Sequence, residues 1–343
     1  MSATSTARET IGVVLAAGKG TRMRSRLPKV LHPVAGRPML HWVLDALAEA
    51  GCARLVVIVG HGGEAVRAAC TDYDIAWVEQ SEQLGTGHAL IQAESSVVDD
   101  ALMLVVSGDV PMVSAATLAT LASTAEEGWG AMAVARLEDP GSLGRVLAGD
   151  GGELERIVEA ADATPEELAV KLVNAGLYAL PAAETFARLA DVGRDNVKGE
   201  IYLTDALGLA AAAGRRIALV ELEDAAEAWG INDRAELARV HGEILRRQQV
   251  ALAAAGVTVL DPARTVIEPG SVESEYPTEI GTGTFIGSDT MLVAPVEVGK
   301  DAMTAAGSVI SKDVPDGALA VERSEQRIIE GWAERRKRKR KKS

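Results

Sequence analysis

Residues 11–29 constrain the fold and the chemistry of this chain more than any other part of the sequence. They begin with IGVVL, an apolar and partly β-branched run that predicts a buried strand. The strand leads into AAGKGTR, a loop of small residues through which backbone N–H groups can approach a phosphate closely. Arg22 and Lys29 then supply full positive charges. This pattern predicts a strand followed by a phosphate-binding loop, although an ordinary turn with basic surface residues would share it.

Two well-known phosphate-binding motifs do not match this loop. No Gly-Lys-Ser/Thr triplet follows at the spacing of a P-loop, and Met23 stands where the dinucleotide fingerprint has its third glycine. The string LAAGKGTRM, followed by Pro28 and Lys29, resembles instead the nucleotide-binding signature of sugar-1-phosphate nucleotidyltransferases. This resemblance implies a phosphate-binding site rather than a simple turn.

Strand-like and helix-like segments alternate over the first two-thirds of the chain. The alternation predicts an α/β fold with a doubly wound, mostly parallel, Rossmann-like sheet that has helices on both faces. Ligands of such sheets gather at the carboxyl ends of the strands, which is where the AAGKGTR loop and Gly108-Asp109 fall. The expected strands are 11–15, 55–59, 75–78 and 103–107, and the expected helices are 39–50, 63–70 and 87–93.

Asp109 follows directly after the apolar run that ends in Ser107-Gly108. A carboxylate at the end of a strand, next to a glycine that lets a ligand approach, is a good ligand for Mg²⁺. Asn232 offers a second oxygen, and two protein ligands suffice because Mg²⁺ keeps waters and shares substrate phosphates. We therefore expect Asp109 and Asn232 to bind Mg²⁺, with a role for Asp109 as the cap of the next helix as the alternative.

Other polar residues suit a nucleobase and a sugar. Gln80 can present an amide donor and acceptor to a base edge, beside the backbone of Gly85-Thr86. Residues 199–205 open an apolar helix and are expected to close the sugar pocket. Three residues at strand ends suit sugar hydroxyl and amide groups, although each could be a turn residue: Gly144, Glu159 and Asn174.

Residues 235–255 predict a long amphipathic helix that links two domains. Its apolar side contains Leu237, Val240, Ile244 and Leu245, and the polar stretch 246–249 is expected to mark its exposed face.

Beyond this helix, aliphatic residues recur at every sixth position, which is typical of a β-helix with about eighteen residues in each three-sided coil. A chance alternation of Val and Ile in a β-rich loop region is the alternative. Val266 and Val272 share the spacing, but eight residues separate Val272 from the next member, so the register slips there. The in-register positions are Ile280, Ile286, Leu292, Val298, Thr304 and Ile310.

Composition and charge fit a soluble enzyme of the cytoplasm. Cys52 and Cys70 are the only cysteines, so no disulfide framework is expected, and no apolar run has the length of a membrane span or a signal-peptide core. Eight consecutive cations at 335–342 are expected to be disordered, although they could contact anionic lipid or RNA. Without them, 27 basic residues stand against 49 acidic ones, which makes nucleic acid an unlikely partner of the body.

These segments occur in the order, and at roughly the spacing, of one family. The chain resembles the bifunctional N-acetylglucosamine-1-phosphate uridyltransferases/glucosamine-1-phosphate acetyltransferases over residues 11–269 and 280–332. The resemblance implies catalytic roles for Arg22, Lys29 and Asp109, a metal site at Asp109 and Asn232, and sugar contacts at Gly144, Glu159 and Asn174. It assigns the uridine nucleotide to Leu15, Ala16, Ala17, Gly18, Lys29, Gln80, Gly85, Thr86, Ser107, Gly108 and Asp109.

The sequence departs from the family pattern near the ligand and in the second half. Ser107 stands where many members carry Tyr, and Leu143 and Ala175 replace a Tyr and a Thr. The acetyltransferase half of the family uses a histidine as general base, but residues 259–343 contain no histidine. The family's sugar-phosphate-binding segments are also missing, and the slip after Val272 lies where those coils would stand. Three positions that contact acetyl-CoA in the family remain, at a site expected to be vestigial: Ser288, Ala306 and Arg323.

We therefore expect a nucleotidyltransferase domain at 1–234, a linker helix at 235–256, a shortened left-handed β-helix at 257–322 and a C-terminal segment at 323–343. The resemblance implies Mg²⁺-dependent synthesis of UDP-N-acetylglucosamine and pyrophosphate from UTP and N-acetylglucosamine 1-phosphate, for cell-wall precursors, by a homotrimer assembled through the β-helix. Two alternatives remain: an enzyme that also acetylates glucosamine 1-phosphate with acetyl-CoA, and a non-catalytic trimeric scaffold that binds nucleotide sugars.

Overall fold

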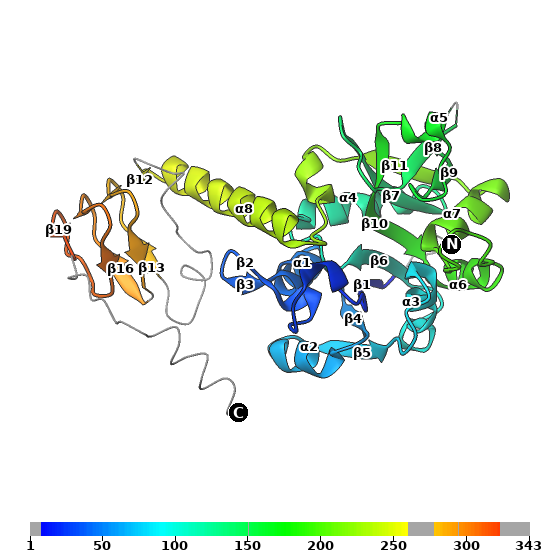
Figure 1. Ribbon diagram of the computed structural model, residues 1–343, viewed down its shortest axis with the longest axis horizontal. Coiled ribbons are helices and arrows are strands. Elements are labelled where there is room, and N and C mark those ends of the chain that lie inside the picture. Colours follow the sequence, from blue (N-terminus) through cyan, green and yellow to red (C-terminus); the bar gives the residue numbers. More distant parts are fainter. Residues whose placement is uncertain (1–7, 150, 260–277, 294, 323–343) are drawn as a thin grey trace, which may run out of the picture. The chain divides into compact units, whose positions relative to one another are not determined.

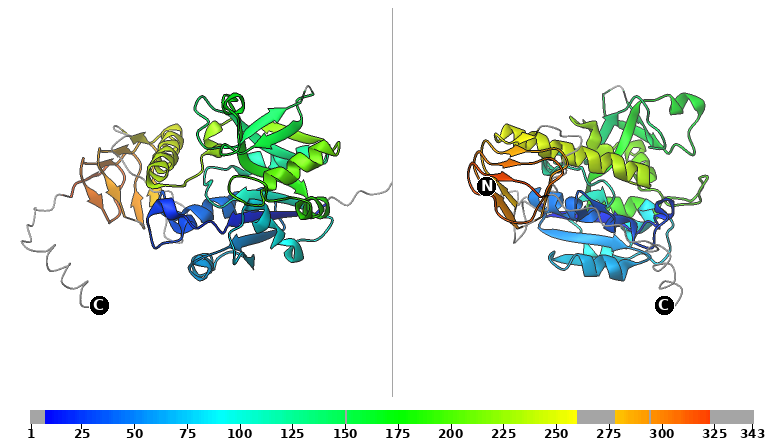
Figure 2. Two further views of the ribbon diagram at one scale, coloured as in Figure 1. Left: turned by 45° about the vertical axis from the view of Figure 1, so that its right-hand side comes forward. Right: turned by 60° about the vertical axis from the view of Figure 1, so that its left-hand side comes forward.

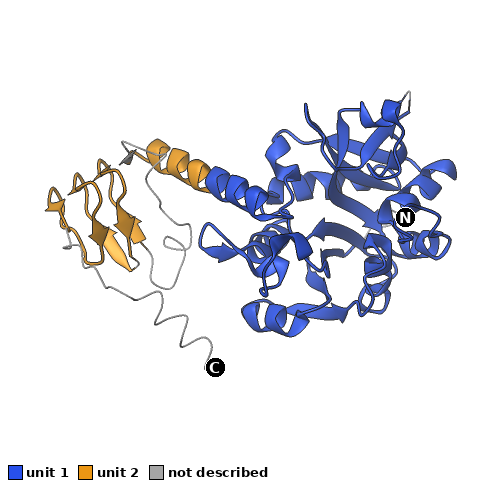
Figure 3. Ribbon diagram, viewed as in Figure 1, with its two compact units in different colours: residues 1–244 blue, residues 245–343 orange. Residues whose placement is uncertain are grey.

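The computed structural model describes residues 8–149, 151–259, 278–293 and 295–322. The chain forms two compact units, residues 1–244 and 245–343 (Figure 3). The division falls inside helix α8 (Arg234–Ala254), which is the helix expected to link the two domains. Each unit is described by itself.

A nine-stranded sheet forms the centre of the first unit (Figure 1). Each of the four expected strands is present and extends one or two residues further than the apolar run that predicted it. Strands β8 (Arg145–Ala148) and β9 (Leu154–Val158) form a hairpin beside the main path of the sheet. The order along that path is β11 (Ile217–Glu221), β7 (Gly130–Arg136), β10 (Leu172–Pro181), β6 (Leu102–Ser107), β1 (Thr10–Ala16), β4 (Arg54–Val59) and β5 (Ile75–Glu79).

Strand β1 pairs in parallel with both β4 and β6, and β4 pairs in parallel with β5. Strand β10 runs antiparallel to its neighbours β6 and β7. The sheet is therefore mostly parallel, as predicted, and the carboxyl ends of β1, β4, β5 and β6 meet at one edge.

Helices pack on the sheet in two groups (Figures 1 and 2). One group contains α1 (Met39–Glu49) and α4 (Ala115–Ala125), which contact each other. The other contains α3 (Thr86–Ile91), α6 (Ala182–Ala190) and α7 (Leu203–Ala212), which contact one another. Shorter helices complete the unit: α2 (Gly63–Ala69), α5 (Pro165–Leu168) and the 3₁₀ turns η1 (Thr21–Met23), η2 (Lys29–Leu31), η3 (Glu94–Ser96) and η4 (Ala225–Ala228). A small hairpin joins β2 (Pro33–Val34) to β3 (Arg37–Pro38).

Helix α8 buries Val240, Ile244 and Leu245, as its apolar pattern predicted. The prediction that residues 246–249 form its exposed face is wrong for Gln249, which is only 5% exposed. Gln249 follows Leu245 by four residues, and residues at that spacing lie on the same side of a helix. The buried side of α8 therefore continues through this polar stretch.

The second unit contains three small parallel sheets made of short strands. Their registers pair Thr278 with Val296, Phe285 with Met303 and Met291 with Val309, so each pairing joins residues 18 apart. This repeat is that of a three-sided parallel β-helix; its expected left-handedness stays a prediction. The strands are β12 (Thr258–Val259), β14 (Phe285–Ile286), β17 (Met303–Thr304) and β19 (Leu319–Ala320) in one sheet, β13 (Thr278–Ile280) and β16 (Val296–Val298) in the second, and β15 (Met291–Leu292) and β18 (Val309–Ile310) in the third.

The six-residue pattern identifies the interior of these coils. Ile286 and Val298 are fully buried and Thr304 is 1% exposed, while Ile280 is partly buried. Thr304 fits an aliphatic position because its hydroxyl pairs with that of Thr290 at 3.0 Å. Glycines follow this ladder because the next coil passes very close: a Cβ on Gly287 would lie 2.5 Å from the carbonyl oxygen of Thr304.

The last described coil is shorter than the others. Met303 pairs with Leu319, and Val298 forms a bridge to Val314, so both pairings join residues 16 apart rather than 18. The positions Val266, Val272 and Arg323 and the basic tail at 335–342 lie outside the described residues. Among the helices that are described, none combines the length and the apolar character needed to cross a membrane.

Candidate functional site

The predicted site lies where β1 and β6 end side by side, since Leu15 and Ser107 are partners in the parallel register. Gly108 allows the next elements to come close, because a Cβ at this position would lie 3.2 Å from Val30 and 3.3 Å from Ala16. Two cavities open at this edge of the sheet.

The larger of these two cavities has a volume of about 450 Å³, within the range of small-molecule sites. It brings together almost all residues predicted to bind the nucleotide, and adds Lys19, Gln83 and Glu200, which sequence reasoning did not select. Lys19 lies in the predicted loop and its charge was the available signal. The predicted residues that line this cavity are Leu15, Ala16, Ala17, Gly18, Lys29, Gln80, Gly85, Thr86, Ser107 and Asp109.

The second cavity, of about 200 Å³, contains the residues predicted to hold the sugar. Gly144, Glu159 and Asn174 line it together with Asn232. Tyr178 also lines it and was not selected from the sequence. Thr204 lines it too, and belongs to the segment 199–205 that was expected to close the sugar pocket. Four residues line both cavities, which therefore adjoin: Leu15, Thr86, Ser107 and Asp109.

Lys29 joins the two predicted metal ligands. Its ammonium group forms a short ion pair with the carboxylate of Asp109 and donates a hydrogen bond of 2.8 Å to Oδ1 of Asn232. An ammonium can only donate, so both partners direct oxygen atoms at the same point. The two side chains thus present a carboxylate and an amide oxygen to one cation.

The start of helix α8 fixes the position of Asn232. The Asp233 carboxylate accepts hydrogen bonds from the backbone N–H groups of Ala235 and Glu236, at 2.8 and 2.9 Å. The Glu236 carboxylate in turn accepts from the N–H of Asp233 at 3.3 Å, and also from the N–H of Asn232 at 2.6 Å. This reciprocal arrangement is a capping box of the D-x-x-E kind. A further hydrogen bond of 2.9 Å, from the N–H of Ile231 to the carbonyl of Asp109, ties the segment to the end of β6.

The loop before α3 is held against residues 200–203. Gly85 adopts φ +108°, and a Cβ there would lie 2.4 Å from the carbonyl oxygen of Ile201, so only glycine fits. The N–H of Gly87 donates to that same oxygen at 2.9 Å, and the N–H of Leu203 donates to the Thr86 hydroxyl at 3.1 Å. The segment expected to close the sugar pocket therefore also supports the nucleotide loop.

Glu159 is one of the two carboxylates that line the smaller cavity, the other being Asp109. Thr204 donates a hydrogen bond of 3.0 Å to its carboxylate. Burial raises the pKa of Glu159, and the Thr204 hydrogen bond and the charge of Lys198 lower it in part. Asn174 sits at a bulge of β10, where its side chain donates to the Tyr178 hydroxyl at 2.6 Å and accepts from the Gly176 N–H at 2.9 Å. Of these two predicted sugar residues, only Glu159 contributes a charge.

Comparisons with known proteins show which family this chain belongs to and which solved structures share its fold. A protein-family model described as the MobA-like NTP transferase domain matches residues 12–193, more than half of the chain. The "Bifunctional protein GlmU" of Syntrophotalea carbinolica is 34% identical, with 94% of this chain and 97% of the relative aligned. The chain belongs to the GlmU family. The proteins of the same name from Alkalilimnicola ehrlichii and Burkholderia pseudomallei are 36% and 41% identical, covering 93% and 84% of this chain and 95% and 63% of each relative.

Solved structures with a similar fold include UDP-glucose pyrophosphorylase in complex with UDP-glucose, with a TM-score of 0.59 and 18% identity over 69% of this chain and 99% of that one. A putative glucose-1-phosphate thymidylyltransferase from Bacillus anthracis has a TM-score of 0.56 and 19% identity, covering 68% of this chain and 94% of its own. These likenesses show a nucleotidyltransferase fold of the first unit.

The GlmU alignments also show that this chain is short. The alignment with the Syntrophotalea protein extends over 449 residues, 106 more than the 343 of this chain, so at least that many positions have no counterpart here. The family membership therefore agrees with the expectation that part of the longer proteins is missing.

Some predicted residues of this GlmU-family chain do not join the two cavities. Arg22 is exposed in η1 and lines neither, although its charge is among the influences that lower the pKa of Asp233, after the Glu236 backbone hydrogen bond. Ser288 and Ala306 stand at the same corner of successive coils in the second unit. Burial raises the pKa of Cys52 to about 12 and that of Cys70 to about 11, so neither thiol is a nucleophile near neutral pH.

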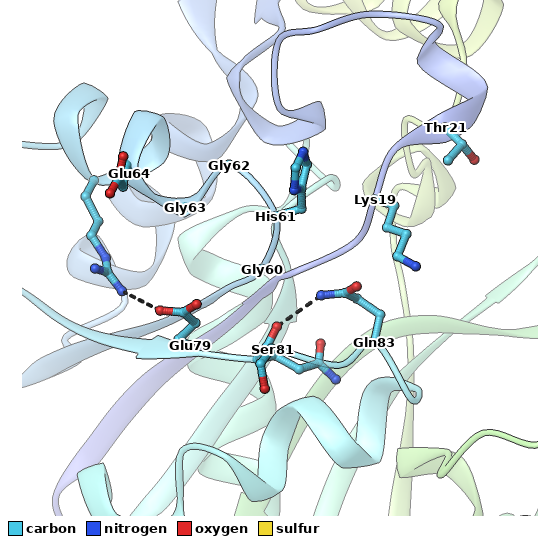
Figure 4. Close-up of a pocket in the computed structure, with 12 residues that line it drawn as sticks. Lys19, Thr21, Gly60, His61, Gly62, Gly63, Glu64, Glu79, Ser81 and Gln83 are labelled. Carbon is cyan, nitrogen blue, oxygen red and sulfur yellow. Dashed lines mark hydrogen bonds and ion pairs between the residues drawn. The ribbon is translucent and has the colours of Figure 1, made fainter.

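A third, outer cavity of about 750 Å³ adjoins the nucleotide cavity, with which it shares Lys19, Gln80 and Gln83. Figure 4 shows Lys19 and Gln83 on one side of it and Glu64 and Glu79 on the other. Charges of both signs line its wall, from Lys19 and Arg67 and from Glu64 and Glu79.

The substitution Glu159→Gln tests the burial of this carboxyl. Because burial raises its pKa, ionisation of Glu159 costs stability, and stability falls as pH rises from the unfolded pKa through the higher folded one. The amide keeps the acceptor for Thr204 without the charge. We expect a higher melting temperature than the unmodified chain at pH 8, with the difference shrinking toward pH 4, in calorimetry over that range. The exposed Glu155→Gln on β9 is the control, and a lower melting temperature for Glu159→Gln at pH 8 would contradict the assignment.

Proposed function

We propose that this chain transfers UMP from UTP to N-acetylglucosamine 1-phosphate, giving UDP-N-acetylglucosamine and pyrophosphate, as a cytoplasmic step toward cell-wall precursors. One observation carries the proposal: two adjoining cavities share Asp109, whose carboxylate is paired with Lys29 and lies beside Asn232. A nucleotide in one cavity and a sugar phosphate in the other would meet at this charged point. The names of the GlmU relatives, and the family resemblance of the motifs, support the choice of substrates.

The residues present fit a bound Mg²⁺. Asp109 and Asn232 direct one carboxylate and one amide oxygen at the Lys29 ammonium, so the structure already gathers hard oxygen donors around a cation. Among the described residues, no group of three or more His, Cys, Asp or Glu side chains is placed to hold a metal ion, so water and phosphate would complete the shell. Mg²⁺ bound by Asp109 and Asn232 would neutralise part of the negative charge of the phosphates.

No side chain needs to act as a nucleophile in this reaction. An oxygen of the sugar phosphate forms a bond to the α-phosphorus of UTP, the bond from that phosphorus to the bridging oxygen breaks, and pyrophosphate leaves with the electron pair. Catalysis then consists of positioning and charge neutralisation. Lys29 holds phosphate oxygens near the reacting centre, and the small residues of the loop after β1 let backbone N–H groups approach the triphosphate.

Arg22 serves the leaving pyrophosphate in this proposal. It is exposed on a short turn, and its side chain has no hydrogen bond or ion pair among the described residues, so it is available to a phosphate that extends past the loop. Its guanidinium can bind two phosphate oxygens at once. A contact made mainly by the departing group would stabilise the transition state more than the bound substrate.

The nucleotide cavity also presents groups that suit uracil. The N–H of Gly85 and the Oε1 atom of Gln80 have no hydrogen-bond partner among the described residues. Together they offer a donor beside an acceptor. Uracil presents the complement, because its O4 accepts and its N3–H donates, whereas cytosine presents a donating amino group in place of O4.

The substitution Asp109→Ala tests the catalytic centre. It removes the carboxylate that pairs with Lys29 and would bind Mg²⁺, so we expect turnover to fall at least about a hundredfold, a loss typical of removing one electrostatic contact to a transition state. Pyrophosphate release from UTP and N-acetylglucosamine 1-phosphate at saturating Mg²⁺ measures it. The exposed Asp100→Ala, before β6 begins, should leave turnover unchanged, and near-normal turnover of Asp109→Ala would refute the site.

We further propose that acetyl transfer has been lost. Transfer to an amine needs a base that removes a proton from the ammonium group, and residues 259–343 contain no histidine. Ser288 and Ala306 remain stacked on successive coils, but contact with acetyl-CoA alone would achieve no reaction. We expect no sugar-dependent release of free thiol from acetyl-CoA and glucosamine 1-phosphate, while the same preparation releases pyrophosphate in the first assay. Steady sugar-dependent thiol release would show instead a bifunctional enzyme.

We also propose a homotrimer through the β-helix. Two of its three sheets expose apolar side chains: Met291 is 59% and Val309 41% exposed on one, and Met303 is 43% and Leu319 61% exposed on another. The third sheet exposes Glu279 and Glu297 instead. Two different apolar faces on each copy suit a closed ring, in which one face meets the other face of the next copy.

Light scattering tests this assembly. At tens of micromolar we expect the mass of three chains, and Met291→Glu should lower it, because a charge would be buried against an apolar neighbour. Glu279→Ala, on the charged sheet, should keep the trimer. A monomeric mass for the unmodified chain at this concentration would exclude the proposed assembly.

A further inference from the structure

His88 has no role in the reaction described above, yet it contacts the side chain proposed to read the base. Gln80 is 3% exposed, and its backbone is fixed by a hydrogen bond of 2.8 Å from its N–H to the carbonyl of Val59. Its Nε2 atom lies 3.3 Å from the carbonyl oxygen of Gly85 and 2.9 Å from Nδ1 of His88. The amide end of Gln80 therefore has two neighbours, one on the backbone and one on a ring.

These contacts decide which way the amide of Gln80 points. The Gly85 carbonyl can only accept, so the atom that faces it must be the amide nitrogen. Both hydrogens of this nitrogen are then used, one by Gly85 and one by His88. The remaining atom, Oε1, has no partner among the described residues, and Gln80 lines the nucleotide cavity. Gln80 therefore presents a hydrogen-bond acceptor, and not a donor, to the nucleotide cavity.

The same contacts decide which nitrogen of the His88 ring accepts a hydrogen bond. Since Gln80 donates to it, Nδ1 of His88 must accept and carries no proton. Gln92, one turn later on the chain, donates to the His88 carbonyl at 3.2 Å and lies 3.5 Å from ring Nε2, beside the other edge of the ring. His88 is half-buried, so the ring is held between the two glutamines.

We propose that His88 is the positioning residue that sets nucleobase selectivity, by holding the Gln80 amide with its oxygen toward the base. The inference rests on the proposed function, because it explains how that site prefers uracil to cytosine. Without the acceptor on His88, only the longer Gly85 contact opposes rotation of the amide. A rotated amide would present its NH₂ group, which suits the N3 atom of cytosine and opposes the N3–H of uracil.

The experiment compares kcat/KM for UTP and for CTP with N-acetylglucosamine 1-phosphate. His88→Ala removes the acceptor at a helix position that tolerates alanine well, and His88→Leu removes it while filling the space. His88→Asn restores an acceptor, because Oδ1 of asparagine lies at about the place of the ring Nδ1. His61→Ala is the matched control, since the His61 ring is exposed and makes no hydrogen bond within the described part of the chain.

We expect the ratio of kcat/KM for UTP to that for CTP to fall about tenfold in His88→Ala and His88→Leu. A change of this size corresponds to the loss of roughly one hydrogen bond. The loss should appear mainly in KM for UTP, because the base is remote from the reacting phosphorus. His88→Asn should recover most of the ratio, and His61→Ala should keep all of it. An unchanged ratio in a folded His88→Ala or His88→Leu, or the same ratio in the Asn and Ala variants, would overturn the proposal. If the unmodified chain transfers no UMP at all, the proposed function itself fails.

Discussion

The ion pair between Lys29 and Asp109, together with the hydrogen bond from Lys29 to Asn232, holds the functional edge of the first unit together. It joins three segments that are far apart in the sequence: the turn after the phosphate loop, the end of β6 and the residues before α8. Each partner is set by local structure, Asp109 by a strand end and Asn232 by the capping box of Asp233 and Glu236. Because two oxygens face one ammonium in a partly buried place, removing any member leaves a charge or a polar group without its partner.

Much of the fold could be predicted because its signals are local. Apolar runs identified β1, β4, β5 and β6 to within two residues, and the six-residue period identified the buried ladder from Ile286 to Ile310. The hairpin of β8 and β9 and the bulge at Asn174 could not be predicted, because they depend on pairing with β10 rather than on a pattern within the segment. The burial of Gln249 could not be predicted from its polar side chain, because it follows from its place one helical turn after Leu245.

The residues of the site could also be predicted where their signal is local, and could not where it depends on contacts made in the folded chain. Residues within the loops after β1 and β6 were predicted because small residues and carboxylates at strand ends have a chemical meaning by themselves. Tyr178 and His88 were not predicted, because an aromatic ring and an imidazole on regular elements look like ordinary packing until their partners are known. Their importance lies in contacts with Asn174 and Gln80, which only the folded chain brings near. Thr204 lies within the segment 199–205 expected to close the sugar pocket, but its hydrogen bond to Glu159 could not be predicted.

The shortened coil shows where this β-helix tolerates a change in length. Met303 pairs with Leu319 and Val298 forms a bridge to Val314, so the strand pairing and the buried ladder shift together by two residues. Val314 is 5% exposed and belongs to the same apolar cluster as Val298 and Ile310. Because only three residues separate Ile310 from Val314, instead of the usual five, the shortening is confined to one corner. A corner of the solenoid can therefore lose two residues while the faces on either side keep their pairing and their core.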